Sequence, residues 1–138
     1  MSDPIAEVLA QQRAGLESLR DVLEVEHQAL LAADAAALPA IAERKMALFS
    51  QIETLEERRR DLFNADPTAD ARADWVGLRS LADEVARANQ RNGAVIGALM
   101  RGADAALQVL RGTDSGSFYG RQGLSTPTGG TSRPLADA

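Results

Sequence analysis

The residues able to carry out chemistry are few in this chain, and they do not form a complete catalytic or metal-binding set. His27 is the only histidine. With Glu24 it gives a Glu-x-x-His spacing, which is half of the di-iron helix-bundle signature; the other half needs a second histidine. A Ser-His-Asp triad would need the same His27, and the sequence has no nucleophile-elbow motif. We therefore interpret His27 as a half-exposed polar residue and predict no enzyme activity, no catalytic residue, no metal site and no cofactor.

The composition narrows the function classes further. The chain has no cysteine, so disulfides, thiolate zinc sites and cysteine nucleophiles are excluded. Its net charge of −5 makes nucleic acid a poor partner, because neutralising phosphates drives such binding. The N-terminus shows no basic start followed by an apolar stretch, and no run of about 18 apolar residues occurs. We expect a cytoplasmic protein without membrane insertion.

One cluster of arginines could suggest phosphate or nucleic-acid binding. Arg58, Arg59 and Arg60 are consecutive. A glutamate three or four residues before an arginine gives a helical pair in the favourable orientation, and we interpret the cluster as a surface paired with the upstream glutamates Glu53, Glu56 and Glu57. Trp75, Lys45 and Arg59 are also interpreted as structural residues. Trp75 is expected to fill the core under a loop, as a core plug, rather than to be a ligand platform. Lys45 and Arg59 are expected to extend along their stems to water.

The segment around Asn89, Asn92 and Gly93 is less easily dismissed. Together with Gly97 and Gly102 it places poor helix formers inside a helical pattern, and each glycine costs up to about 1 kcal/mol relative to alanine. One interpretation is that Gly93 and Gly97 let another backbone approach closely. The other is a local bend or a register-setting polar layer, a role in which buried asparagine is known. The residues alone leave both open.

Apolar spacing predicts three helices that carry these residues, at about Pro4–Leu31, Asp34–Phe63 and Ala69–Arg111. Ser2 or Asp3 is expected to cap the first helix. Pro39 is expected to kink the second or delay its start to about Leu38, and Gly112 to end the third. Each helix has a seam, the row of positions at alternating spacings of three and four that should face the neighbouring helices. The first seam is Ile5, Leu9, Gln12, Leu16, Leu19, Leu23, Glu26 and Leu30. The second is Leu38, Ile41, Lys45, Leu48, Ile52, Leu55, Arg59 and Leu62. The third is Trp75, Leu78, Ala82, Val85, Asn89, Asn92, Ile96, Leu99, Ala103, Ala106 and Leu110.

The expected fold is all-α, with three long helices, neighbours antiparallel, forming an elongated helical hairpin or bundle with coiled-coil-like packing. Large side chains are scarce, since the chain has three Phe, one Tyr and one Trp, and the packing should be thin. Residues 1–112 form one helical domain in this interpretation. Residues 113–138 are rich in Gly, Ser and Thr and are expected to be a disordered tail.

Helix lengths predict where the third helix runs out of neighbours. The first two span about 42 Å each and the third about 63 Å, at 1.5 Å per residue. Laid back along the hairpin, the third passes its neighbours near residue 97 and leaves Ala98–Arg111 uncovered. Exposed apolar stripes of this size usually mark interaction sites. The stripe consists of Leu99, Met100, Ala103, Leu107 and Leu110.

Several of these features together resemble the FlgN-type flagellar export chaperones. The second helix carries Asp34, Leu38 and the run Ile41-Ala42-Glu43-Arg44-Lys45. The third carries Asn89-x-x-Asn92-Gly93 with Ile96 behind it, and the tail carries Tyr119-Gly120-Arg121-Gln122-Gly123. The resemblance extends over nearly the whole chain. Pro39 is a departure from the family's pattern.

The resemblance implies a helical chaperone that binds C-terminal segments of the hook–filament junction proteins FlgK and FlgL. Such chaperones prevent premature assembly and deliver their partners to the flagellar type III export gate. It also implies that Tyr119 docks on the cytoplasmic domain of that gate. It places the partner site on the C-terminal part of the long helix, and the length argument points to the same region. The expected partner-binding residues are Val85, Asn89, Asn92, Ile96, Gly97, Leu99, Met100, Ala103, Leu107 and Leu110.

Other classes stay open at this stage. The stripe could close a homo-oligomer in a structural coiled-coil or adaptor protein. The chain could also serve other flagellar subunits, or be a helix-bundle enzyme or metal carrier, although one histidine and no cysteine disfavour the last. The expected free state is a monomer or a weak dimer.

Overall fold

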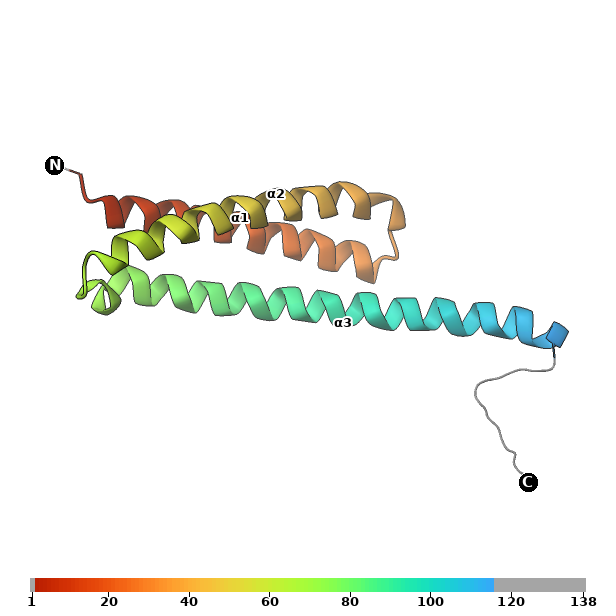
Figure 1. Ribbon diagram of the computed structural model, residues 1–138. Helices are drawn as coiled ribbons and strands as arrows, with labels where there is room; N and C mark the ends of the chain where they lie inside the picture. Colours follow the sequence, from red (N-terminus) through yellow and green to blue (C-terminus); the bar gives the residue numbers. More distant parts are fainter. Residues whose placement is uncertain (1, 116–138) are drawn as a thin grey trace, which may run out of the picture. The chain divides into compact units, whose positions relative to one another are not determined.

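The computed structural model describes residues 2–115. Within this range there are α-helices and short 3₁₀ turns and no β-strand, as an all-α fold with three long helices requires. Figure 1 shows the helices in chain order. The elements are α1 (Pro4–Leu31), η1 (Ala35–Ala37), α2 (Leu38–Asn64), η2 (Ala69–Ala71) and α3 (Ala73–Ser115).

The boundaries of α1 follow from local chemistry. The Asp3 carboxylate accepts hydrogen bonds from the backbone N–H groups of Ile5 (3.1 Å) and Ala6 (3.2 Å), and Pro4 occupies the first turn, where its missing N–H leaves no bond unmade. The predicted cap at Asp3 is confirmed. At the other end, Ala33 adopts a left-handed conformation with φ of 55°. This reverses the chain after α1, in a position that glycine usually fills.

The later boundaries confirm one prediction and correct two. α2 begins at Leu38 with Pro39 in its first turn, so the proline delays the helix as expected. α3 begins at Ala73, after η2, rather than near Ala69. It also continues past Gly112 to Ser115, so the predicted end at Gly112 is wrong: the backbone there stays helical instead of reversing.

The core lies around α1. All eight predicted seam positions of α1 are buried, and so are Val8, Val22 and Ala29, because α1 packs against α2 on one side and α3 on another. α1 and α2 run side by side in opposite directions (Figure 1). A Cβ atom on Gly15 would lie 3.1 Å from Ile52 Cγ1, so the glycine permits this close approach. By contrast α2 buries no residue completely, and its eight predicted seam positions are all half-buried.

The first part of α3 closes the core on the other side of α1. Leu78, Leu81 and Val85 are buried, whereas the predicted seam residue Ala82 is exposed. The seam therefore runs through Leu81, one position earlier than the regular spacing placed it. The chain divides into two units after Ile96, and every residue from Ala98 to Arg111 is exposed.

By length and composition alone, α3 is one described helix that could cross a membrane, over Ala73–Arg111. Between Gly93 and Leu110, however, it carries Arg101 and Asp104. Each charge near the middle of a bilayer costs about 2.5–3.5 kcal/mol.

Candidate functional site

The structure separates the ten predicted partner-binding residues into three groups. Val85 and Asn92 are buried, with exposed fractions of 4% and 0%, so a partner cannot reach them in this state. Asn89 and Gly97 are half-exposed. The other six are exposed, and we call them the distal stripe: Ile96, Leu99, Met100, Ala103, Leu107 and Leu110.

Asn92 is part of a buried polar network that joins all three helices. Its Nδ2 donates to the Leu23 carbonyl oxygen and to Glu26 Oε1, both at 2.8 Å. Lys45 Nζ donates to both oxygens of the same Glu26 carboxylate at 3.2 Å. Because a buried amide is costly unless its hydrogen bonds are made, these partners fix where α3 sits along α1. The structure supports the interpretation of Asn92 as part of a buried polar layer. The prediction that Lys45 extends to water is wrong, because its Nζ binds Glu26 instead.

The glycines of α3 at positions 93, 97 and 102 make no close contact with another helix that would explain them, whereas a Cβ added to Gly77 would lie 3.2 Å from Arg13 Nη2 of α1. Among the described residues no atom lies within 4 Å of a Cβ added to Gly93 or Gly102, and the one neighbour of Gly97 is the Arg101 side chain of the same helix, at 3.4 Å. Within residues 2–115, therefore, no other backbone makes the close approach that one of the two interpretations placed at Gly93 and Gly97.

The distal stripe has a geometry suited to binding rather than to chemistry. Ile96, Leu99, Ala103 and Leu107 follow each other at spacings of three and four, which place them along one side of a helix. Leu99, Leu107 and Leu110 are 49%, 51% and 68% exposed. An apolar side this open offers contact area for another helix.

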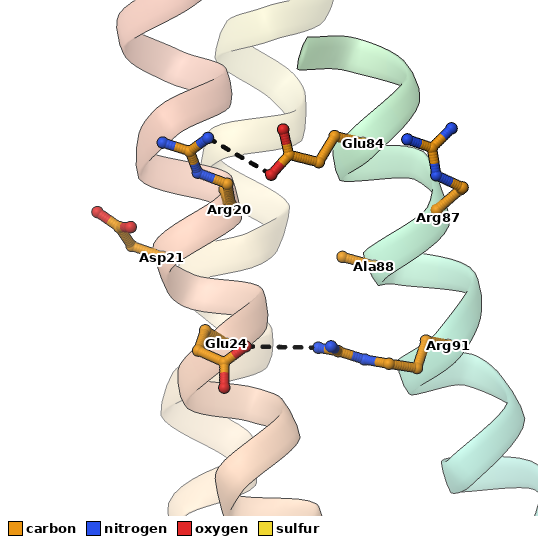
Figure 2. Close-up of a pocket in the computed structure, with 7 residues that line it drawn as sticks. All are labelled: Arg20, Asp21, Glu24, Glu84, Arg87, Ala88 and Arg91. Carbon is orange, nitrogen blue, oxygen red and sulfur yellow. Dashed lines mark ion pairs between the residues drawn. The ribbon is translucent and has the colours of Figure 1, made fainter. Parts of the chain in front are cut away.

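A hollow between α1 and α3 is bordered by charges of both signs (Figure 2). Arg20 on α1 pairs with Glu84 on α3 at 3.5 Å, and Glu24 on α1 pairs with Arg91 on α3 at 3.8 Å. Hydrogen bonding from Gln28, helped by the positive charge of Arg91, lowers the pKa of Glu24. The three basic and three acidic residues that line the hollow balance one another, so it has little net charge to attract an ionic ligand. The two ion pairs link α3 to α1.

The arginine cluster forms fewer pairs than predicted. Arg59 donates to Glu56 at 2.8 and 2.7 Å, and Arg60 Nε lies 3.3 Å from the same carboxylate. The Arg59 hydrogen bonds are the main reason why the pKa of Glu56 is lowered. Within residues 2–115 neither Glu53 nor Glu57 has an ion pair, so the predicted pairing of these two glutamates is wrong.

Trp75 is a half-buried plug, as predicted. Its ring meets Phe63 edge to face at 5.2 Å, and the Arg59 guanidinium lies 4.1 Å from the ring centre. Arg59 is therefore held against the aromatic pair by Glu56 and does not reach into water, contrary to the prediction.

The sequence did not predict the ion-pair cluster that links the start of α3 to the start of α1. Arg72 donates to Asp3 at 3.0 Å and to Asp74 at 3.0 and 2.9 Å. Hydrogen bonds lower the pKa of both carboxyls: the Ala6 N–H is the largest cause for Asp3, and Arg72 is for Asp74. The same contacts raise the pKa of Arg72. The contact between Arg72 and Asp3 joins residues far apart in sequence, so no local pattern could have revealed it.

The residues considered for chemistry remain dispersed. His27 is half-buried as predicted, and its Nδ1 has no hydrogen-bond partner among residues 2–115. Glu24 is engaged by Gln28 and Arg91. No group of three or more candidate metal ligands occurs in the described part of the chain. Tyr119 and nearly all of the predicted tail, 113–138, lie outside the described residues.

Comparisons with known proteins agree on one family. The family model described as FlgN protein matches residues 1–127. The flagella synthesis protein FlgN of Escherichia coli is 27% identical over 126 residues, covering 90% of this chain and 91% of that protein. The protein of the same name from Salmonella typhimurium is 28% identical over 126 residues, covering 88% and 90%. No solved structure matches the chain.

Proposed function

The chain belongs to the FlgN family of flagellar synthesis proteins, and we propose that it is a cytoplasmic export chaperone for the hook–filament junction proteins FlgK and FlgL. In this proposal it binds their C-terminal segments, prevents premature assembly and delivers them to the cytoplasmic domain of the flagellar export gate. Tyr119 serves as the docking residue for the gate. No enzymatic step is involved.

The observation that carries the proposal is the distal stripe. Burial of apolar surface is worth about 25 cal/mol per Å², and the exposed leucines and Met100 leave such surface open to water. An amphipathic helix of a junction protein laid along the stripe would cover it, in the helix-in-groove mode of recognition. Met100 adapts to two partners of different shape because its side chain is flexible. Gly97 leaves room for close approach.

Binding of a partner helix to the distal stripe would also delay assembly of that partner. A partner helix covered by the stripe cannot pair with its neighbours in a growing filament, so binding delays assembly. The polar network at Asn92 supports this arrangement, because it holds α3 in place immediately before the stripe begins. Val85 and Asn92, buried in the bundle, then act as support and not as contacts.

The test replaces two stripe leucines by charges. Leu99→Asp with Leu107→Asp is expected to weaken binding to purified FlgK and FlgL at least a hundredfold in calorimetry, because two carboxylates would be desolvated in an apolar contact. The matched control is Val25→Asp with Val76→Asp, which changes two valines that are 57% and 54% exposed. Both variants should keep the wild-type helical circular dichroism. Unchanged binding by the leucine variant would place the site elsewhere.

A second candidate function rests on the same exposed stripe. It could close a homo-oligomer, as in a structural coiled-coil or adaptor protein. Light scattering coupled to chromatography distinguishes the two proposals. A stable dimer that the same Leu99→Asp, Leu107→Asp change converts to a monomer would favour the adaptor. A monomer at micromolar concentration that binds FlgK or FlgL would favour the chaperone.

A further inference from the structure

A second apolar surface lies between α2 and α3, over α1. A hollow of about 270 Å³ there is lined by residues of all three helices: Gln12 and Leu16 of α1, Ile52 and Glu56 of α2, and Trp75, Leu78, Arg79 and Ala82 of α3. It lies beside the seam residues of α2, which are half-buried and therefore leave one face of the bundle open to solvent. A three-helix arrangement with such a face resembles a four-helix bundle that lacks one member.

The same hollow contains a polar group with an unmet requirement. Gln12 lines it and is only 3% exposed. Its Nε2 donates to Glu56 Oε1 at 3.0 Å, whereas its Oε1 is buried and has no hydrogen-bond partner in the described part of the chain. A buried acceptor without a donor costs about 1–3 kcal/mol. A donor on a bound partner would remove this cost after a small rotation of the amide.

Acidic residues border the adjoining surface of α2. A neighbouring hollow shares Ile52 and Glu56 with the first and adds Met46, Phe49 and Arg60 to its lining, and Arg60 is paired with Glu56 at 3.3 Å. Met46 is 68% exposed. Glu53 and Glu57 line this second hollow and have no ion pair within residues 2–115. Their charges are therefore available to an incoming cation.

From these features we infer a second protein-docking surface, the acidic groove, defined by Gln12, Ile52, Glu53, Glu57, Trp75 and Ala82. Its occupant is an amphipathic helix of a partner protein whose apolar stripe is flanked by Lys or Arg. The apolar residues enter between α2 and α3, the basic ones face Glu53 and Glu57, and one donor reaches Gln12.

The inference is independent of the proposed function. The acidic groove shares no residue with the distal stripe, and a chain that failed to bind FlgK or FlgL could still bind a basic helix here. The groove also contains its own reporter, because Trp75 is the only tryptophan and lines the hollow. Its fluorescence reports directly on occupancy.

The test uses the full chain and two synthetic 18-residue helical peptides. Both have leucines at heptad positions a and d, and the remaining positions are Lys in one peptide and Glu in the other. The Leu/Lys peptide is expected to shift Trp75 emission and to bind at least tenfold more tightly than the Leu/Glu peptide. Binding should weaken with added salt, since exposed charges are screened. Equal binding of the two peptides would overturn the inference.

Three variants locate the binding. Glu53→Lys with Glu57→Lys should weaken Leu/Lys binding at least tenfold. The control Glu17→Lys with Asp21→Lys makes the same charge change at exposed positions of α1 and should stay within twofold of wild type. Ala82→Phe should also weaken binding tenfold, because it fills the hollow without changing charge.

The variants can also refute the acidic groove. Equal loss in the control pair would indicate non-specific attraction to an acidic protein, and unaltered binding by Ala82→Phe would exclude the hollow. A concentration-dependent shift of Trp75 emission without peptide would assign the surface to a second copy of this chain. Each of these results overturns the inference, whereas the expected pattern in all three variants supports it.

Discussion

The two parts of α3 share one helix and differ in what covers their apolar side. In the proximal part, Leu78, Leu81 and Val85 lie against α1, and Asn92 is bound in a polar network. In the distal part, from Ala98 to Arg111, every side chain is exposed. Periodicity alone gives both parts the same pattern. The comparison teaches that an apolar spacing predicts a helix reliably, whereas the covering of its apolar side depends on whether a neighbour reaches it.

The largest expected effect comes from breaking the network that ends the proximal part. Glu26→Ala removes the acceptor shared by Lys45 and Asn92 and leaves a cation whose side chain is only 16% exposed without its partner. Removing one member of a buried pair typically costs about 3–5 kcal/mol, and we expect that loss in urea unfolding. Asp104→Ala, a carboxylate of the distal part, is the control and should change stability by less than about 0.5 kcal/mol. Equal effects would mean that the network does not hold α3.

The same substitution made in each part tests the difference in burial directly. Leu81 is 6% exposed and Leu107 is 51% exposed. Leu81→Ala should cost about 2–4 kcal/mol, because it removes buried methyl groups and leaves a cavity. Leu107→Ala should stay within about 0.5 kcal/mol. Thermal unfolding followed by circular dichroism measures both. A large loss from Leu107→Ala would show that the distal part is covered within this chain or by a second copy.

Most of the fold could be predicted because it depends on local chemistry. The Asp3 cap, the delayed start at Leu38 and the eight buried positions of α1 all follow from residue type and spacing. The burial pattern that could not be predicted depends on which of the three helices packs between the other two. The additional burial of Val8 and Val22 and the shift from Ala82 to Leu81 arise because α1 has two neighbours, which no single-helix pattern encodes.

The candidate site could be predicted only in part, for a related reason. Helix lengths placed the end of packing near residue 97, and the first unit ends at Ile96. Spacing could not distinguish Asn92 from Ile96, since both lie on the same predicted seam. In the structure Asn92 is buried and bonded to α1, where it supports the bundle, whereas Ile96 is exposed. The acidic groove was missed because sequence proximity assigned Glu53 and Glu57 to the arginines.

The smallest effect concerns the glycines that continue into the distal part. Gly102 has no atom within 4 Å of an added Cβ among the described residues, so Gly102→Ala should stabilise the local helix by up to about 1 kcal/mol. Amide hydrogen exchange of residues 98–111 measures this gain, which global unfolding would not report. Gly97→Ala should give a similar gain, since its one neighbour is the flexible Arg101 side chain. If Gly97 admits a partner helix, however, its alanine variant should also weaken FlgK binding several-fold, while Gly102→Ala should not. If the two variants protect the helix equally and bind FlgK equally, Gly97 is not part of the site. Binding by the distal part would then rest on its exposed apolar side chains alone.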